Sequence, residues 1–328
     1  MGWRATSAIE IWAPAKLNLF LEVLGKRADG FHELETLLVP INLFDTLRFT
    51  PTQSNDLHLD CEWAQGLLAK PAATAIWGDL PPSRSNLVVR ALELLRQRAS
   101  VSDGAQIQLI KRIPAAAGLG GASSDAAAAL RAGNIAWQIG WSEAQLADLS
   151  AELGSDIPFF FAGGAALCRG RGEQVENVEA GGVMHVVVVR PPIGLATAEV
   201  YRGVRLGHQP HSSIDLCEGY RQGNAKRVAR ALVNRLQSAA EELTPWVRKL
   251  ASAFRDCGVE GHQLTGSGSC YFGVCSGARH ARQVAARIRA RDFGPVWALS
   301  TLPRTEASRG TGIQEGVGSW KSPRCASS

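Results

Sequence analysis

Apolar and polar positions alternate through much of the first sixty residues of the chain. The stretch 16–61 has this pattern and is broken once, at Arg27-Ala28-Asp29-Gly30, whose composition is typical of a turn. Apolar residues then recur with helical spacing at 87–98, and alternation returns at 105–110. The pattern therefore predicts β-structure followed by a helix and a further strand.

A run of four valines that ends at Val189 predicts a buried strand in the second half of the chain. Apolar spacing at 224–243 and at 246–257 predicts helices, and 263–275 has the composition of a loop that enters a strand. Helices and strands are thus expected on both sides of the chain's midpoint.

The length of 328 residues is sufficient for about two domains. Because the pattern changes near residues 179–182, we place an N-terminal domain at 1–180 and a C-terminal domain at 181–303. Residues 304–328 are rich in Ser, Gly, Thr and Arg, and we expect a disordered tail there.

Composition argues against several classes of protein. Hydrophobic residues at 45% and charged residues at 20% are typical of a globular protein, and no segment approaches the length of a membrane span. The net charge of +5 is scattered along apparent helix faces, whereas nucleic-acid binding needs a clustered stripe. Seven cysteines without a C-x-x-C pair favour reduced thiols. We expect a cytoplasmic protein with neither a nucleic-acid nor a membrane partner.

The segment 113–130, IPAAAGLGGASSDAAAAL, places glycines directly before a run of small helix formers. Glycine allows a positive φ and a close ligand, and the first turn of a helix has free N–H groups that suit phosphate. Neither familiar nucleotide loop fits, because no lysine follows Gly121 and Ser123 occupies the third glycine position of G-x-G-x-x-G. The alternative is an alanine-rich core helix with a flexible entry.

Three polar features could complete a site. Lys16 and Asn18 share one face of the first predicted strand, although a solvated strand face is the plainer interpretation. Asp156 precedes Ile157-Pro158, which is also the pattern of a helix N-cap, and capping and catalysis are compatible. The sequence LTGSGSC at 264–270 is a second Gly and Ser loop, or else a tight turn.

Five blocks taken together carry a family resemblance. They are, in order, APAKLNLFLEVLGKRADGFHEL, RSNLVVRA, IPAAAGLGGASSDAA, LGSDIPFFF and LTGSGSC. Over about residues 12 to 300 the chain resembles the GHMP small-molecule kinases. The first block is similar to the branch that phosphorylates the 2-hydroxyl of a cytidine diphosphate methylerythritol in the non-mevalonate isoprenoid pathway.

This resemblance implies an α+β fold of two domains, a ribosomal-protein-S5-like N-terminal domain and a ferredoxin-like C-terminal domain, with the site between them. It implies ATP and Mg²⁺ as cofactors, a small-molecule substrate, and a monomer or homodimer. The metal ligands and the oligomeric state stay open. Other GHMP enzymes such as mevalonate or homoserine kinase, a non-catalytic ATP-binding module and a nucleic-acid-binding protein are the alternatives.

The resemblance also assigns roles to individual residues. Lys16 and Asp156 correspond to the catalytic pair. The nucleotide would contact Pro114, Gly118, Leu119, Gly120, Gly121, Ser123, Ser124 and Asn86. The alcohol would contact Asn18, Phe31, His32, Thr197 and Tyr201.

Three positions depart from the family pattern. In this family the position of Phe31 is often tyrosine and that of Tyr201 is often phenylalanine. Two aromatic rings could therefore still enclose a cytosine, with the phenol hydroxyl on the other ring. Arg235 replaces an acid in N-D-[LF]-[EQ], which concerns local packing more than chemistry. Since phosphoryl transfer depends on positioning and charge neutralisation, an aspartate beside a lysine at a phosphate loop is suited to it.

Overall fold

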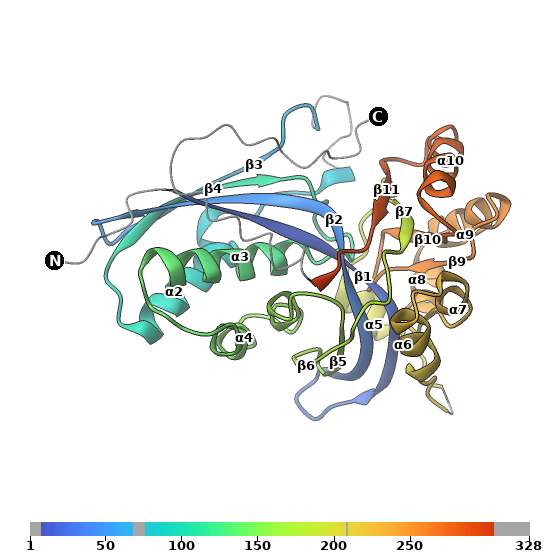
Figure 1. Ribbon diagram of the computed structural model, residues 1–328, viewed down its shortest axis with the longest axis horizontal. Coiled ribbons are helices and arrows are strands. Elements are labelled where there is room, and N and C mark those ends of the chain that lie inside the picture. The colour runs from blue at the N-terminus through green and yellow to red at the C-terminus, as the bar shows by residue number, and fades with distance from the viewer. Residues whose placement is uncertain (1–7, 68–75, 208, 305–328) are drawn as a thin grey trace.

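The computed structural model describes residues 8–67, 76–207 and 209–304, and the predicted tail 304–328 lies outside them except for its first residue. Two β-sheets with helices packed on them form the molecule (Figure 1). The expected mixture of helix and strand in both halves of the chain is confirmed. No helix in the described part of the chain is both long and apolar enough to cross a membrane.

The larger sheet is built on a long antiparallel hairpin, which joins β1 (Ile9–Lys26) to β2 (His32–Thr52) through the predicted turn. Its strands follow the order β3-β4-β2-β1-β8, and β5 pairs with β2 and β6 with β5. The other strands are β3 (Leu57–Trp63), β4 (Gly104–Lys111), β5 (Ala166–Gly170), β6 (Gln174–Asn177) and β8 (Val233–Asn234). The two strands of the hairpin therefore form the middle of the sheet, with β4 and β5 paired to β2 and β8 paired to β1.

Helices α2 (Leu87–Ala99) and α3 (Gly121–Ala136) pack against each other and along the larger sheet (Figure 1). Small side chains bring them close, because a Cβ at Gly133 would lie 3.0 Å from Leu92 Cδ2. Helix α4 (Glu143–Ser150) begins at a capping box formed by Ser142 and Gln145. The short helices η1 (Ser83–Ser85) and η2 (Pro158–Phe161) complete this part.

The smaller sheet has the order β11-β7-β10-β9, and all of its pairs are antiparallel. Its strands are β7 (His185–Val189), β9 (Gly261–Leu264), β10 (Tyr271–Cys275) and β11 (Val296–Ser300). Helices α9 (Trp246–Asp256) and α10 (Ala278–Arg289) pack on it. Val186 and Val188 belong to one hydrophobic cluster and Val187 and Val189 to another, and both clusters include side chains of the larger sheet, so all four valines are buried.

The prediction of helix throughout 224–243 is wrong. The segment forms α7 (Ala225–Arg230), then β8, then α8 (Gln237–Leu243), because β8 pairs in parallel with β1 and the Arg235 amide donates to the Leu21 carbonyl (2.8 Å). The proposed boundary at residue 180 lies between β6 and β7, and β8 from beyond it joins the larger sheet. Helices α5 (Thr197–Arg202) and α6 (Ile214–Arg221) connect the two parts.

Candidate active site

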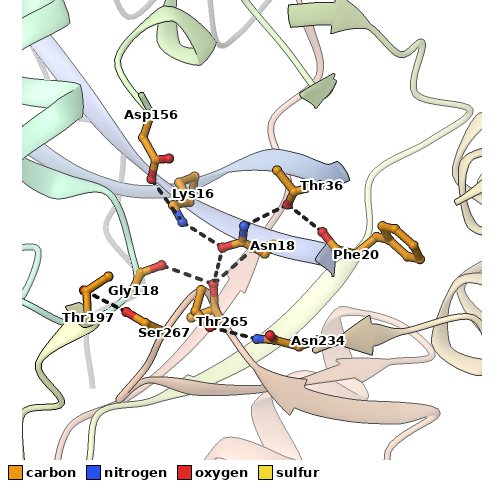
Figure 2. A network of polar contacts seen from close by, with 11 residues as sticks. Lys16, Asn18, Phe20, Thr36, Gly118, Asp156, Thr197, Asn234, Thr265 and Ser267 are labelled. Carbon is orange, nitrogen blue, oxygen red and sulfur yellow. Dashed lines mark hydrogen bonds and ion pairs between the residues drawn. The ribbon is translucent and has the colours of Figure 1, made fainter. Parts of the chain in front are cut away.

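Lys16 and Asn18 lie on β1 with buried side chains, each only 3% exposed. The Lys16 ammonium donates to Asn18 Oδ1 (2.7 Å), and Asn18 Nδ2 donates to Thr36 Oγ1 (2.9 Å), as Figure 2 shows. Thr36 donates in turn to the carbonyl of Phe20 (2.6 Å). The solvated-face interpretation is therefore wrong, because this chain of hydrogen bonds holds the ammonium at a defined position.

Asp156 lies between α4 and η2, and its Oδ2 is 3.6 Å from Lys16 Nζ (Figure 2). The N-cap of η2 is Ile157, with no side-chain capping hydrogen bond. The interpretation of Asp156 as a helix cap is therefore wrong. Its side chain is 45% exposed while that of Lys16 is 4% exposed, so the pair presents its acidic member to solvent.

The glycine loop begins α3 beside this pair. Gly118 and Gly120 have φ values of +75° and +70°, and Gly120 is the N-cap of the helix. A Cβ at Gly120 would lie 2.8 Å from Cγ of Lys16, so this glycine also leaves room for the lysine stem. The Lys16 amide donates to the carbonyl of Leu119 (2.9 Å). The free N–H groups of the first helical turn and a buried ammonium thus lie together, an arrangement suited to phosphate.

The loop 264–270 packs against the glycine loop. Thr265 Oγ1 accepts the Asn18 amide (3.1 Å) and donates to the carbonyl of Gly118 (3.2 Å). A Cβ at Gly118 would lie 2.2 Å from the Thr265 carbonyl oxygen. Asn234 Nδ2 holds the loop from the other side by donating to two of its carbonyls, each at 2.8 Å. This loop is therefore part of the site and more than a tight turn.

Aromatic side chains gather near the turn that joins β1 to β2. The rings of His32 and Tyr201 have centroids 5.0 Å apart. Burial raises the pKa of Tyr201, and the negative charge of Asp156 adds to the rise, so this ring lies near the carboxylate. Phe31 is 50% exposed, and the Arg171 guanidinium carbon lies 4.8 Å from its ring centroid. Tyr201 therefore contacts His32, while Phe31 contacts Arg171.

Several of the predicted ligand residues have structural contacts. Asn86 caps α2, since its Oδ1 accepts the amide of Val88 (3.0 Å). Thr197 Oγ1 lies 2.9 Å from Ser267 Oγ, which joins α5 to the second loop. Pro114, Leu119 and Gly121 are buried, and Ser123 is half-buried. The Ser124 hydroxyl is buried and has no hydrogen-bond partner among the described residues.

Two contributors were not predicted from the sequence. Thr265 lies in the Gly and Ser loop at 264–270, but its contact with the Asn18 amide joins residues 247 apart in the chain and depends on tertiary packing. Arg171 lies in the turn between β5 and β6, and no local pattern indicates that this turn faces the hairpin. A Cβ at the neighbouring Gly172 would lie 3.7 Å from Asp156 Oδ1, so the same turn borders the catalytic candidate.

Comparison with known proteins identifies the class first. The family described as GHMP kinases N terminal domain matches residues 86–164, and the family described as GHMP kinases C terminal matches residues 215–292. The chain is similar to a solved homoserine kinase from Cytophaga hutchinsonii, with 16% identity and a TM-score of 0.72 over 93% of this chain and 98% of that one. At this low identity the similarity shows the fold alone.

Two closer relatives identify the family within that class. A 4-diphosphocytidyl-2-C-methyl-D-erythritol kinase from Pelotomaculum thermopropionicum is 43% identical over 85% of this chain and 93% of its own. A solved 4-(cytidine 5'-diphospho)-2C-methyl-D-erythritol kinase is 34% identical with a TM-score of 0.73, covering 89% of this chain and 99% of its own. The chain belongs to the 4-diphosphocytidyl-2-C-methyl-D-erythritol kinase family and is an ATP-dependent small-molecule kinase.

Proposed function

We propose that the chain transfers the γ-phosphoryl group of ATP to the 2-hydroxyl of 4-diphosphocytidyl-2-C-methyl-D-erythritol, which gives the 2-phosphate and ADP. The observation that carries this proposal is the Lys16–Asp156 pair at 3.6 Å, set against the glycine loop that begins α3. Identity of 43% to a relative of that name supports the choice of alcohol.

The ATP phosphates are proposed to lie on the first turn of α3, where N–H groups without helical partners meet the Lys16 ammonium. Mg²⁺ would enter as the MgATP complex, held mainly by phosphate oxygens. In keeping with this, the described residues hold no cluster of three or more His, Cys, Asp or Glu side chains that could bind a metal without the nucleotide.

The alcohol is proposed to lie along the hairpin end, with its cytosine between Phe31 and Tyr201 and its pyrimidine edge near His32. Burial lowers the pKa of His32, with a contribution from Lys26, so its imidazole is neutral at neutral pH and offers one donor and one acceptor. Arg171 over Phe31 occupies a face that a base could use. We propose that this guanidinium moves aside or contacts the pyrimidine when the substrate binds.

Asp156 is the proposed proton acceptor. Its half-exposed carboxylate can reach an incoming hydroxyl, whereas Lys16 is buried and fixed by Asn18. Because the transition state of phosphoryl transfer is loose, the acceptor proton leaves late, and orientation of the hydroxyl is as important as basicity. Lys16 would orient Asp156 and neutralise charge on the transferred group.

Release of ADP with different acceptor alcohols tests the proposal. We expect turnover with 4-diphosphocytidyl-2-C-methyl-D-erythritol and at most background rates with mevalonate or homoserine. Equal or greater turnover with either of those alcohols would reassign the acceptor within the GHMP kinases. Binding of ATP without turnover on any of the three would favour a catalytically silent module.

The cytoplasmic location remains a prediction. The described segments contain six free cysteines, and five of these are buried. Free, buried cysteines are expected for reduced thiols and support this location.

A further inference from the structure

Arg190 follows β7 and is one of the largest fully buried side chains of the described residues, at 2% exposure. Its guanidinium donates to four neutral oxygens. Nε bonds the Ile76 carbonyl (3.0 Å), Nη1 bonds the Ile193 carbonyl (2.6 Å) and Ser269 Oγ, and Nη2 lies 3.5 Å from the Ala115 carbonyl. Arg190 thus contacts both the glycine loop and the second loop from behind.

Among the described residues, no acidic side chain compensates the charge of Arg190. Three cationic side chains of the described residues are buried, and the other two have acidic partners: Lys16 pairs with Asp156, and Lys111 with Asp45 and Asp125. No carboxylate of the described residues pairs with Arg190. Burial lowers the pKa of Arg190, and no carboxylate of the described residues opposes this shift. Burial of a cation without a counter-ion costs stability, which hydrogen bonds to neutral oxygens offset only in part.

The position of Arg190 indicates a use for this charge. Ala115 lies three residues before Gly118, and Ser269 lies in the loop that touches Gly118 through Thr265. A charge acts over a longer distance in a protein interior than in water, because the surroundings screen it less. The field of Arg190 therefore extends to the loop where a polyanion is expected.

We propose that Arg190 is a positioning residue for the nucleotide, whose buried positive charge between the two loops favours binding of the phosphate chain without touching it. This inference rests on the proposed phosphate site at the glycine loop. It does not depend on which alcohol is phosphorylated, so nucleotide binding without any acceptor tests it separately.

Calorimetric titration of ATP, ADP and adenosine into Arg190→Gln is the direct experiment, because glutamine keeps hydrogen-bond donors and removes the charge. We expect the ATP Kd to rise about tenfold or more, the ADP Kd less, and the adenosine Kd less than about twofold. An equal loss for all three ligands, or an unchanged ATP Kd, would overturn the proposal. A purely structural role would lower the melting temperature without this dependence on ligand charge.

Arg287→Gln is the matched control, since Arg287 lies on α10 and also donates to backbone carbonyls, those of Asp256 and Cys257. It removes the same charge from α10, where Arg287 contacts neither the glycine loop nor the second loop through any described hydrogen bond, and it should leave the ATP Kd unchanged. A comparable loss of ATP affinity in this control would reduce the Arg190 effect to net charge and overturn the proposal.

Arg190→Lys is a second test, and it applies even if the uncharged variant Arg190→Gln does not fold. Near pH 7 it should bind ATP within about threefold of the unaltered protein, because the charge remains. A buried lysine without an acidic partner loses its proton more easily than an arginine, so its ATP affinity should fall between pH 7 and about 9.5 relative to the unaltered protein. Equal pH dependence of the two proteins would contradict the proposal.

Discussion

At the scale of single residues, two lysines are buried beside aspartates in different surroundings. Lys16 faces Asp156, whose side chain is 45% exposed, so that pair can meet a substrate. Lys111 is enclosed between Asp45 and Asp125, which are 0% and 3% exposed, so that cluster stays inside the protein. We therefore propose that similar charges serve the reaction in one place and packing in the other, and exposure of the carboxylate distinguishes the two pairs.

The Lys111 cluster should make stability depend on pH. Burial raises the pKa of Asp125 to about 8, against the opposing charge of Lys111, and the negative charge of Asp45 raises it further. The folded state then holds a proton that the unfolded carboxyl releases near pH 4, so this group's contribution to the free energy of unfolding falls as pH rises from about 4 to about 8.

Asp125→Asn removes this titration. Urea unfolding at pH 5, 6, 7 and 8 should show the unaltered protein losing stability relative to the variant, by up to about 1.4 kcal/mol per pH unit. The idea fails if the difference in free energy of unfolding between the two proteins is the same at all four pH values.

Phe31 should act on the alcohol and not on the nucleotide. An aromatic platform for a base is worth about 1 to 3 kcal/mol, so Phe31→Ala should raise the KM for the alcohol about tenfold or more. The KM for ATP should hardly change, and Phe31→Tyr should keep both values. Equal rises of both KM values in steady-state assays would mean that Phe31 supports the fold.

At the scale of elements, the two loops work as one unit. The glycine loop begins α3 and the second loop joins β9 to β10, yet Thr265 bonds both β1 and the carbonyl of Gly118. Since the loops belong to different sheets, their contact sets the distance between α3 and the smaller sheet. The absence of a side chain at Gly118 makes this contact possible.

Gly118→Ala tests this contact, with Gly140→Ala as its control. Both glycines have positive φ, +75° and +79°, but a Cβ at Gly118 would meet the Thr265 carbonyl at 2.2 Å while one at Gly140 has nothing within 4 Å. The control should cost only the backbone strain of about 1 to 2 kcal/mol. Gly118→Ala should in addition raise the KM for ATP about tenfold. Equal effects of the two changes on ATP would show that loop contact is unimportant.

Local patterns predicted elements better than the contacts between them. The helix expected at 87–98 is observed as Leu87–Ala99, because its apolar spacing and its Asn86 cap are both local signals. The helix expected at 224–243 is interrupted, because β8 gains its pairing from β1, more than 200 residues earlier. Likewise Lys16 and the glycine loop lie in contiguous motifs, whereas Thr265 and Arg171 enter the site only through tertiary packing.

At the scale of the whole molecule, two hydrophobic clusters of the described residues each contain side chains from both sheets. Leu17 and Val39 of the larger sheet share a cluster with Val186 and Phe272 of the smaller one. The strand β8 and the side chain of Asn234 add polar links across the same junction. The site therefore lies at a junction that packing holds together, which suits a reaction that depends on positioning.

We expect the two sheets to unfold together. Tryptophan fluorescence and far-ultraviolet circular dichroism should give coincident urea transitions, because separating the sheets would expose their shared core. Two transitions with distinct midpoints would show that the sheets are independently stable and that the junction is weak.

The kcat of Asp156→Asn tests most directly whether Asp156, beside Lys16, accepts the proton and orients the hydroxyl in phosphoryl transfer. Because Asp156 is half-exposed and caps no helix, the melting temperature and both KM values should hold while kcat falls by about 10² to 10⁴. Asp148→Asn, at an exposed aspartate of α4, is the control and should keep full kcat. A kcat for Asp156→Asn within threefold of the unaltered protein, at unchanged stability, would contradict the account.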